Sequence, residues 1–388
     1  DPETDSVVLW SQARPDDTSE IVAARWQVST TADFSDIVAS GVAQSSQSKD
    51  FTLKVVAEGL TAGTDYYYRF LYDGESSAIG QTKTLPEGSV DSLTFAIFSC
   101  TNYPAGFFNA YNAAVANGFD YSIHLGDYIY EYGLGEYATE DAEALGRVPS
   151  PTTEIVTPAD YTLRYQQYHS DTDLQALRAK APMIMMWDDH ETANDSYRNG
   201  AQNHDPSTEG TWADRRDAGL EAYYNWNPVR IPESGDLTDA DKSYTFGDLA
   251  TLHMVETRLQ ARDETRADIQ AAVTNQIATY TADTTGATFA ADVLRFPSLV
   301  PGGTDLTDPT AIAALAADSS FVANLAVTAL LAEAADPDRS MLGDAQMAEV
   351  VSRINAATTT WDVIGSQTLM NEMTLPTALL LDPTTVPA

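Results

Sequence analysis

The chain is poor in cysteine and in lysine. It has one cysteine, Cys100, so an internal disulfide framework is excluded and cysteine usage does not decide the redox compartment. Five of its 21 basic residues are lysines, and 57 acidic residues bring the formal net charge to -36. Because the acid is spread along the chain, it is typical of a solvated surface. A charge of this sign argues against nucleic acid as the partner and against binding to anionic membranes.

A long apolar run is missing as well. No run approaches the ~18 residues that a membrane-spanning helix needs, so the sequence predicts no transmembrane segment. The first residues, DPETDSVVLW, are acidic and enter a strand pattern at once, without a signal peptide. A mature secreted or periplasmic protein, from which the signal peptide has been removed, begins in this way, and we expect this location. The sequence gives no indication of the oligomeric state.

The length of 388 residues suits two domains. From Ser6 to about Leu85, short alternating stretches such as IVAARWQVST and DYYYRFLYDG are separated by turn residues. Period-two alternation at this spacing predicts an antiparallel β-sandwich of the immunoglobulin or fibronectin kind. The segment Thr84–Ser92, TLPEGSVDS, has the composition of a linker. We therefore expect a β-sandwich domain over residues 1–88 and a second domain over residues 89–388.

The second domain has the pattern of an α/β fold. The run LTFAIFSC predicts a strand buried on both faces, FFNAYNAAVANG predicts a helix, and FDYSIHLGD predicts a second buried strand. The stretch PMIMMWDDHE predicts a third strand, and KSYTFGDLATLHMVETR predicts a strand pair. Residues 274–335 are rich in alanine, threonine and aspartate and have only weak helical periodicity. We interpret them as an insertion or lid.

Polar side chains follow each of the three predicted strands at the point where the strand ends. In open α/β sheets, ligands bind outside the carboxyl ends of the strands. The position of these groups, as well as their type, therefore indicates a binding site at one edge of the sheet. The groups are Cys100 after the first strand, Asp127 and Tyr130 after the second, and Asp188, Asp189, His190, Glu191 and Asn194 after the third.

The residue types indicate metal ions. Thiolate and phenolate are anionic donors for a highly charged transition metal, whereas carboxylate and amide oxygens suit a hard cation such as calcium. The sequence contains no CxxC, HExxH or EF-hand loop, so the common metal motifs are absent. The mixture of donors predicts a mixed-metal site rather than a zinc tetrahedron.

Each residue also has a plainer interpretation, and the sequence leaves these alternatives open. A single cysteine is more often a small core residue, an aspartate after glycine often caps a turn, and a tyrosine often packs in the core. A histidine among acids can form a structural ion pair, and an arginine on a helix is usually solvated or salt-bridged. Together these interpretations require five coincidences, at Cys100, Asp127, Tyr130, His190 and Arg164.

Several segments resemble those of a known family. They are SCTNYPAGFFNAY, HLGDYIYEYG, RYQQYHSDTDLQALRAKAPMIMMWDDHETANDS, AYYNWNPVR, YTFGDLATLHMVETRLQARD and MLGDAQ. They are similar to the PhoD-type alkaline phosphatases, secreted metallophosphoesterases related to purple acid phosphatases. The opening DPETDSVVLWSQARP resembles the β-sandwich domain that precedes the catalytic domain in that family. The resemblance covers nearly the whole chain apart from residues 274–335.

The resemblance implies a metallophosphoesterase-like α/β/β/α sandwich, in which two mixed sheets flanked by helices hold ferric iron and calcium. It implies that Cys100 and Tyr130 are iron ligands and that Asp127 bridges iron and calcium. Asp189 and Asn194 are the further ligand positions that it implies in the third motif.

The resemblance also implies two residues for the substrate. His190 would contact the phosphate or the leaving group, and Arg164 would grip the phosphate, since a guanidinium can bind two phosphate oxygens at once. One feature departs from the family, which completes its metal site with histidines and a late Gly-Asp-x-His segment. That segment is absent after WDVIGSQTLMNEM, so we expect either a fragment or a chain that has lost its late ligands. The 388 residues would then not make a complete two-metal centre.

The predicted function is metal-dependent hydrolysis of phosphate esters, with a metal-activated nucleophile and release of inorganic phosphate. The partner would be a phosphate ester substrate. Two other hypotheses stay open. The chain could be a non-catalytic binding or surface protein that works through its β-sandwich, with the remainder as a degenerate phosphatase scaffold. It could also be a phosphodiesterase on the same scaffold.

Overall fold

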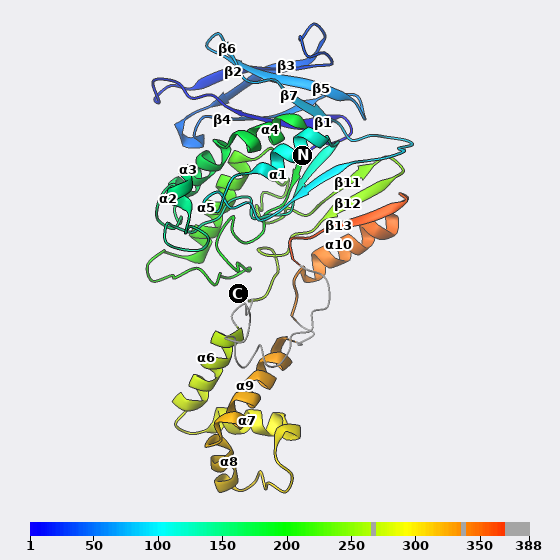
Figure 1. Ribbon diagram of the computed structural model, residues 1–388. Coiled ribbons are helices and arrows are strands. Elements are labelled where there is room, and N and C mark those ends of the chain that lie inside the picture. Colours follow the sequence, from blue (N-terminus) through cyan, green and yellow to red (C-terminus); the bar gives the residue numbers. More distant parts are fainter. Residues whose placement is uncertain (265–268, 335–338, 369–388) are drawn as a thin grey trace. The chain divides into compact units, whose positions relative to one another are not determined.

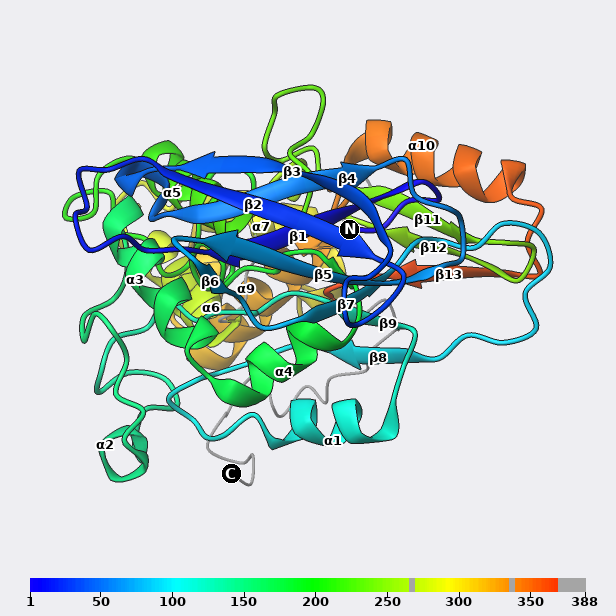
Figure 2. The same ribbon diagram turned by 90° about the horizontal axis from the view of Figure 1, so that it is seen from above.

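The computed structural model describes residues 1–264, 269–334 and 339–368 (Figures 1 and 2). The chain divides into two compact units. The first comprises residues 1–264 and 341–369, and the second comprises residues 265–340 and 370–388. The first unit contains both the predicted β-sandwich and the predicted strand-helix-strand segments.

The N-terminal part of the first unit is an antiparallel β-sandwich, as predicted. One sheet pairs β1 with β4, and the other has the order β3-β2-β5-β6, with β7 also pairing with β5. Inward residues of both sheets, among them Leu9, Val28 and Phe70, form one buried core. The strands are β1 (Ser6–Gln12), β2 (Val22–Ser29), β3 (Ile37–Ser45), β4 (Thr52–Glu58), β5 (Asp65–Tyr72), β6 (Glu75–Ser76) and β7 (Gly80–Lys83), with the 3-10 turn η1 (Gln47–Lys49) before β4.

The next part is an α/β layer around a parallel sheet of order β10-β9-β8. The predicted strand-helix-strand unit is confirmed, because β8 and β9 are parallel and α1 connects them. All four residues of β9 are buried, as expected for the central strand. The elements are β8 (Phe95–Phe98), α1 (Asn109–Asn117), β9 (Tyr121–His124), α2 (Ala142–Leu145), α3 (Pro158–His169), α4 (Thr172–Lys180), β10 (Met183–Met185) and α5 (Trp212–Trp226).

The expectation that β8 is buried on both faces is wrong. Among the strands that the structure describes, β8 pairs only with β9 and is the edge of its sheet. None of its four residues is fully buried, and Ile97 is 60% exposed. An unbroken apolar run thus indicates a strand, but it does not decide whether that strand is central or at the edge.

A second sheet has the order β11-β12-β13. Its strands are β11 (Lys242–Phe246), β12 (Ala250–Met254) and β13 (Trp361–Gly365); β11 and β12 form the predicted antiparallel pair, and β13 is parallel to β12. Helix α10 (Gly343–Ala356) lies beside this sheet (Figure 2). The Gln346 amide of α10 donates to the backbone oxygen of Glu256, 3.0 Å away, and so ties the helix to the segment after β12.

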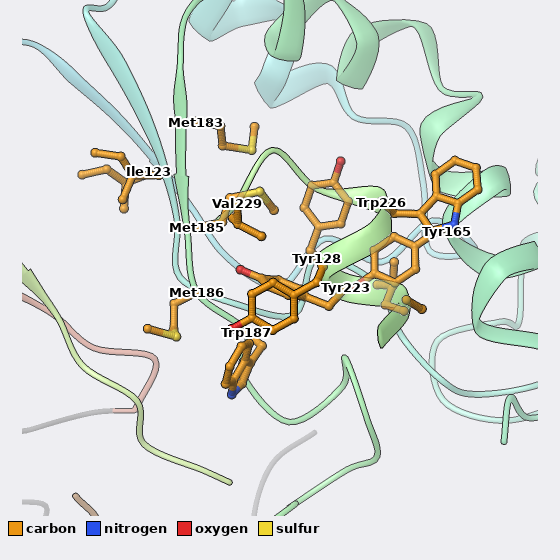
Figure 3. Close-up of a cluster of buried hydrophobic side chains, with 14 of the residues drawn as sticks. Ile123, Tyr128, Tyr165, Met183, Met185, Met186, Trp187, Tyr223, Trp226 and Val229 are labelled. Atoms are coloured by element: carbon orange, nitrogen blue, oxygen red, sulfur yellow. The ribbon is translucent and has the colours of Figure 1, made fainter. Parts of the chain in front are cut away.

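Aromatic and methionine side chains fill the core beneath β9 and β10 (Figure 3). Tyr165 of α3 and Trp226 of α5 stack with ring centroids 6.4 Å apart and planes 8° from parallel. Helix α3 begins with a capping box between Thr157 and Asp160, and Pro158 takes the first position, where no backbone donor is needed. The packing holds both helices against the sheet and fixes where its strands end. Figure 3 labels Ile123, Tyr128, Tyr165, Met183, Met185, Met186, Trp187, Tyr223, Trp226 and Val229.

The described residues of the second unit are helical, with the elements α6 (Ile269–Ala282), α7 (Ala287–Arg295), η2 (Pro297–Leu299), α8 (Pro309–Ala316) and α9 (Ser319–Ala334). Phe289, Val293, Phe321 and Leu325 belong to a hydrophobic core that is separate from the cores of the first unit. The predicted insertion at residues 274–335 falls in this unit, and its action as a lid stays a prediction. Within the described ranges, no single helix is long and apolar enough to cross a membrane, although Pro309–Ala316 and Ser319–Ala332 pass that test as a pair bent by 91°.

Candidate metal centre

The parallel sheet brings the three polar motifs to one edge. Beyond β8 and β9, the backbone of Cys100 donates to the Gly126 oxygen at 3.2 Å, and that of Thr101 donates to the Asp127 oxygen at 2.7 Å. These bonds continue the pairing of the two strands into the loops that carry the functional groups. The side chains of the first two motifs therefore meet because their strands are parallel neighbours.

The backbone is left-handed at two of the predicted ligand positions. Cys100 has φ 58° and Asp127 has φ 55°, a region that residues other than glycine rarely adopt. Such conformations cost about 1–3 kcal/mol each and persist where the surrounding structure determines them. Here they set the direction of both side chains at the ends of their strands, where Asp127 is buried and Cys100 is exposed.

Cys100, Asp127 and Tyr130 meet at one carboxylate oxygen. The Cys100 thiol donates to Oδ2 of Asp127 at 3.4 Å, and the Tyr130 hydroxyl donates to the same oxygen at 3.2 Å. The other oxygen, Oδ1, is buried and has no hydrogen-bond partner among the residues that the structure describes. A buried carboxylate oxygen without a partner is costly, so this atom points to a ligand that the chain does not itself supply.

Asp127 also belongs to a compact group with Asp189 and His190. One ligand atom of each residue lies within 4.8 Å of the others, and all three residues are buried. Burial raises the pKa of Asp127 to about 6, although the nearby His190 acts in the opposite direction. Burial also tends to raise the pKa of Asp189, but Arg258 and His190 outweigh it, so that this pKa is lowered. The two carboxylates are thus held in different protonation environments.

His190 is oriented by a carboxylate that the sequence analysis did not single out. Nδ1 of His190 lies 2.6 Å from Oε2 of the fully buried Glu131. Burial acts to lower the pKa of His190, but the Glu131 carboxylate outweighs it and raises this pKa to about 10. With Nδ1 engaged in this way, Nε2 is the ring atom that His190 offers to the Asp127–Asp189 side.

A further buried carboxylate, Glu191, which the sequence analysis placed among the polar groups after the third strand, links the second motif to the third. Glu191 accepts hydrogen bonds from the backbone nitrogens of Asp127 at 3.1 Å, Tyr128 at 2.5 Å and Asp188 at 2.8 Å. Three backbone hydrogen bonds from two different strand ends fix the second motif against the third.

An arginine, Arg258, in the segment after β12, contacts the carboxylates of the third motif. Its Nε and Nη2 contact the two carboxylate oxygens of Asp188 at 2.5 and 3.2 Å, and Nη2 lies 3.3 Å from Asp189. The sequence offered a signal for it, because Arg258 comes shortly after Met254, the last residue of the buried strand β12. The sequence analysis considered the ends of three strands and did not include the end of β12.

Arg164, the predicted phosphate clamp, is placed differently. It is 0% exposed, and its guanidinium donates to the backbone oxygens of Tyr130, Ser150 and Pro151. These bonds tie the loop after β9 to the loop before α3, which is a structural role. A phosphate could reach the guanidinium only after these bonds were broken.

Asn194 lies beside the cluster rather than in it. Its backbone nitrogen donates to Glu131 at 2.7 Å, and its side-chain amide donates to Gln202 at 2.8 Å. The residue is half-buried. The structure therefore brings Cys100, Asp127, Tyr130, Asp189 and His190 together, places Asn194 at their margin and sets Arg164 apart.

The charges and donor types fit a bound cation. Burial raises the pKa of the Cys100 thiol and of the Tyr130 hydroxyl, so both hold their protons until a metal replaces them. Thiolate, phenolate, carboxylate and imidazole are donors for a transition metal, and the unpartnered Asp127 oxygen is the atom available to it. In the described part of the chain, the carboxyl groups near the cluster are Asp127, Glu131, Asp188, Asp189, Glu191 and Asp195, and the cationic groups are His190, Arg258 and Arg262.

A pocket of about 310 Å³ borders the exposed Cys100. Its walls are mostly apolar, and Phe107 on its rim is 58% exposed. The Arg147 guanidinium lies 5.1 Å from the centroid of the Phe107 ring. The pocket offers an apolar surface directly beside the cluster, with Phe98, Phe107, Phe108 and Tyr111 as its aromatic lining.

An antiparallel β-sandwich followed by an α/β layer, with a buried aspartate-histidine group at the strand ends, defines a two-part α/β protein with a candidate metal centre. The chain belongs to the PhoD-like phosphatase family. The sequence model of the PhoD-like phosphatase matches residues 95–383, and that of the PhoD-like phosphatase N-terminal domain matches residues 1–86. The resemblance stated from the sequence motifs is confirmed.

Two relatives support this assignment. Alkaline phosphatase D of Bacillus subtilis (strain 168) is 38% identical in an alignment of 275 residues that covers 68% of this chain and 46% of that protein. A solved structure described as "Structure of PhoD" superposes with a TM-score of 0.71 at 30% sequence identity, over 94% of this chain and 60% of that one. The chain thus spans about half the length of the curated relative that it matches.

Proposed function

We propose that this chain hydrolyses phosphate esters at the cluster of Asp127, Asp189 and His190 and releases inorganic phosphate. The observation that carries the proposal is the unpartnered buried oxygen of Asp127, within a group whose ligand atoms lie within 4.8 Å of one another. Membership of a phosphatase family and similarity to a protein named alkaline phosphatase D support it.

Ferric iron and calcium are the metals that we propose for the site. Cys100 and Tyr130 would hold iron through thiolate and phenolate, and Asp127 would bridge the two ions. Asp189, with Asn194 at the margin of the cluster, would supply oxygen ligands for calcium. When bound, such ions lower the pKa of a water molecule and neutralise phosphoryl oxygens. The hydrogen bonds of Cys100 and Tyr130 to one Asp127 oxygen support this division of the ligands.

The residues of the chain have separate tasks in this reaction. His190 holds a proton at physiological pH, because Glu131 raises its pKa to about 10, and it can donate from Nε2 to a phosphate or leaving-group oxygen. Arg258 is the cation that we assign to the phosphate side of the cluster, in place of Arg164. Its guanidinium lowers the pKa of Asp189 against the effect of burial, and its hydrogen bonds hold Asp188 in place beside the substrate.

We also propose a location outside the cytoplasm, which the resemblance to secreted phosphatases supports. Fractionation of cells that express the full-length gene would test it. Activity and protein in the periplasmic or extracellular fraction are the expected result, and retention of both in the cytoplasm would overturn this part of the proposal.

Elemental analysis of the purified chain, with a visible spectrum and hydrolysis assays, tests the function. We expect bound iron and calcium, a visible absorption band from the iron phenolate, and hydrolysis of an aryl phosphate monoester assayed beside an aryl diester. Cys100→Ser and Asp127→Asn should lose the band and the activity, whereas Asn225→Leu, on α5, should keep both. A colourless, metal-free and inactive wild-type chain would favour the non-catalytic binding protein.

A further inference from the structure

A series of hydrogen-bonded polar side chains, buried or half-buried, lies behind His190. We call it the Glu131 network and define it as His190, Glu131, Asn203, Glu154 and Arg215. Its members come from four separate segments: the loop after β9, the loop before α3, the loops after β10, and helix α5. None of the last four residues was singled out from the sequence.

Glu131 is the hub of the network. It is fully buried, and its Oε2 faces Nδ1 of His190 at 2.6 Å. Its other oxygen, Oε1, accepts from the backbone nitrogen of Asn194 at 2.7 Å and from Nδ2 of Asn203 at 3.0 Å. A buried carboxylate keeps one orientation only if both oxygens have partners, since either unpaired oxygen is costly. The donors on Oε1 therefore decide where Oε2 points.

Asn203 separates two carboxylates. Its Nδ2 lies 3.0 Å from Oε1 of Glu131 and 3.0 Å from Oε1 of Glu154. An amide nitrogen carries two hydrogens, so it can donate one to each carboxylate at the same time. Without the amide, two acidic groups would face each other across the space that it fills, and like charges at short range repel strongly in a buried site.

Arg215 anchors the far end of the network. It is buried in α5, and its Nη2 donates to Glu154 at 2.5 Å. Nη1 donates to the backbone oxygen of Asn203 at 2.7 Å and to Glu209 at 2.5 Å. The same guanidinium therefore fixes both the carboxylate that Asn203 touches and the backbone of Asn203 itself. A rigid helix, rather than a loop, determines where the amide sits.

We propose that Asn203 is a positioning residue for His190: by donating to Glu131 and Glu154 together, it holds Glu131 in the orientation that receives Nδ1 of His190 and keeps Nε2 at the Asp127–Asp189 cluster. The importance of this for catalysis rests on the proposed function. The hydrogen-bond geometry itself does not depend on that function and can be tested on the metal-free protein.

Proton NMR of the metal-free chain reads the His190–Glu131 bond directly. An imidazole N–H that donates to a buried carboxylate resonates far downfield, and His190→Gln identifies the signal by removing it. Asn203→Leu should shift or broaden this resonance. Asn225→Leu is the matched control, because Asn225 is also half-buried and bonded through both side-chain atoms, to Thr52 and Lys49, and should leave the resonance unchanged.

Asn203→Ser, a smaller polar change at this half-buried position, repeats the measurement if the leucine variant does not fold. Kinetics of the metal-loaded chain supply the second readout. Loss of a hydrogen-bond partner behind a functional group typically costs about 10–100-fold in activity or metal affinity. We expect a fall of that size in kcat for Asn203→Leu, with KM little changed, because the substrate contacts themselves remain.

The outcomes are distinct. An unchanged His190 resonance in both Asn203 variants would overturn the positioning role. An equal change in Asn225→Leu would also overturn it, since the effect would then be general. A shifted resonance in a chain without any phosphatase activity would support the positioning role and overturn the proposed function instead.

Discussion

Gly126 and Asp188 are packed so closely that a Cβ atom on Gly126 would lie 2.3 Å from the Asp188 backbone nitrogen. Gly126 also has φ +94°, where side chains are strained. The glycine of the second motif thus lets the ends of β9 and β10 touch, and this contact places Asp127 next to Asp189. The close approach is the structural reason for glycine at this position.

Gly126→Ala should therefore lower the free energy of unfolding by more than about 2 kcal/mol, from backbone strain and a clash with backbone that cannot give way. Gly118→Ala is the control, since Gly118 has φ +78° but nothing within 4 Å of the added carbon. It should cost about 1–2 kcal/mol from strain alone. Urea unfolding measures both, and equal losses would contradict the role of the close contact.

Arg258→Met should destabilise the chain by about 3–5 kcal/mol, because it leaves the buried Asp188 carboxylate without its bidentate partner. It should also abolish hydrolysis if Arg258 serves the substrate. Arg216→Met provides the comparison: its pair with Asp217 is exposed, and exposed pairs contribute about 0–1 kcal/mol. Thermal unfolding and activity would be measured on both variants, and a fully active Arg258→Met would contradict the assignment.

Asp127→Asn should stabilise the metal-free chain at alkaline pH. Burial raises the pKa of Asp127 to about 6, so the folded state holds its proton more tightly than the unfolded state, and stability falls as the pH rises from about 4 to 6. Above this window the ionised carboxylate costs about 3 kcal/mol, which asparagine does not incur. Melting temperatures with and without metal measure this effect. We expect metal to stabilise only the wild type, and an asparagine variant that is equally stabilised by metal would contradict it.

His124 should make the chain sensitive to acid. The ring is fully buried beside Thr101 and Tyr111, and burial lowers its pKa to about 3. Above about pH 6.5 the His124 ring is neutral in both the folded and the unfolded state, so it does not change the free energy of unfolding. Below this pH only the unfolded state takes up a proton on the ring. Stability should then fall by up to about 1.4 kcal/mol per pH unit from this group. His124→Gln should show a shallower slope of unfolding free energy between about pH 7 and pH 5, and an identical slope would refute the prediction.

Phe107→Ala should raise KM for an aryl phosphate more than for a small alkyl phosphate. The exposed ring borders the apolar pocket beside Cys100, where a leaving group could bury apolar surface. Loss of an aromatic wall is worth about 1–2 kcal/mol, or roughly 5–30-fold in KM for the aryl ester. Steady-state kinetics with the two esters decide this. Parallel changes for both esters would argue that the pocket does not receive the leaving group.

The sequence predicted those features that follow from a single strand or from its end. The alternation of the first 85 residues indicated the β-sandwich, and the strand ends indicated that Cys100, Asp127 and Asp189 would meet. Parallel pairing makes such meetings predictable, because every strand delivers its carboxyl end to the same edge.

What the sequence did not reveal depends on contacts between distant segments. The burial of β8 depends on whether neighbouring strands pair with both of its edges, and the sequence of β8 alone does not determine this. Arg164 and Arg258 both lie near the polar motifs in the sequence. Only the fold shows that Arg164 donates to backbone oxygens whereas Arg258 contacts carboxylates. The bridge from Asn203 to Glu131 spans 72 residues and leaves no periodic trace in the sequence.

The left-handed backbone at Cys100 and Asp127 lowers the stability of the chain at two positions whose side chains the proposed metal site requires. Glycine would relax either position, and an uncharged residue would suit the dry surroundings of Asp127 better, yet both changes would remove a donor from the cluster. A directed-evolution campaign that rewards heat resistance alone should therefore erode these two residues early. A mutant library designed to raise the thermal stability of this chain would have to keep Cys100 and Asp127 unchanged.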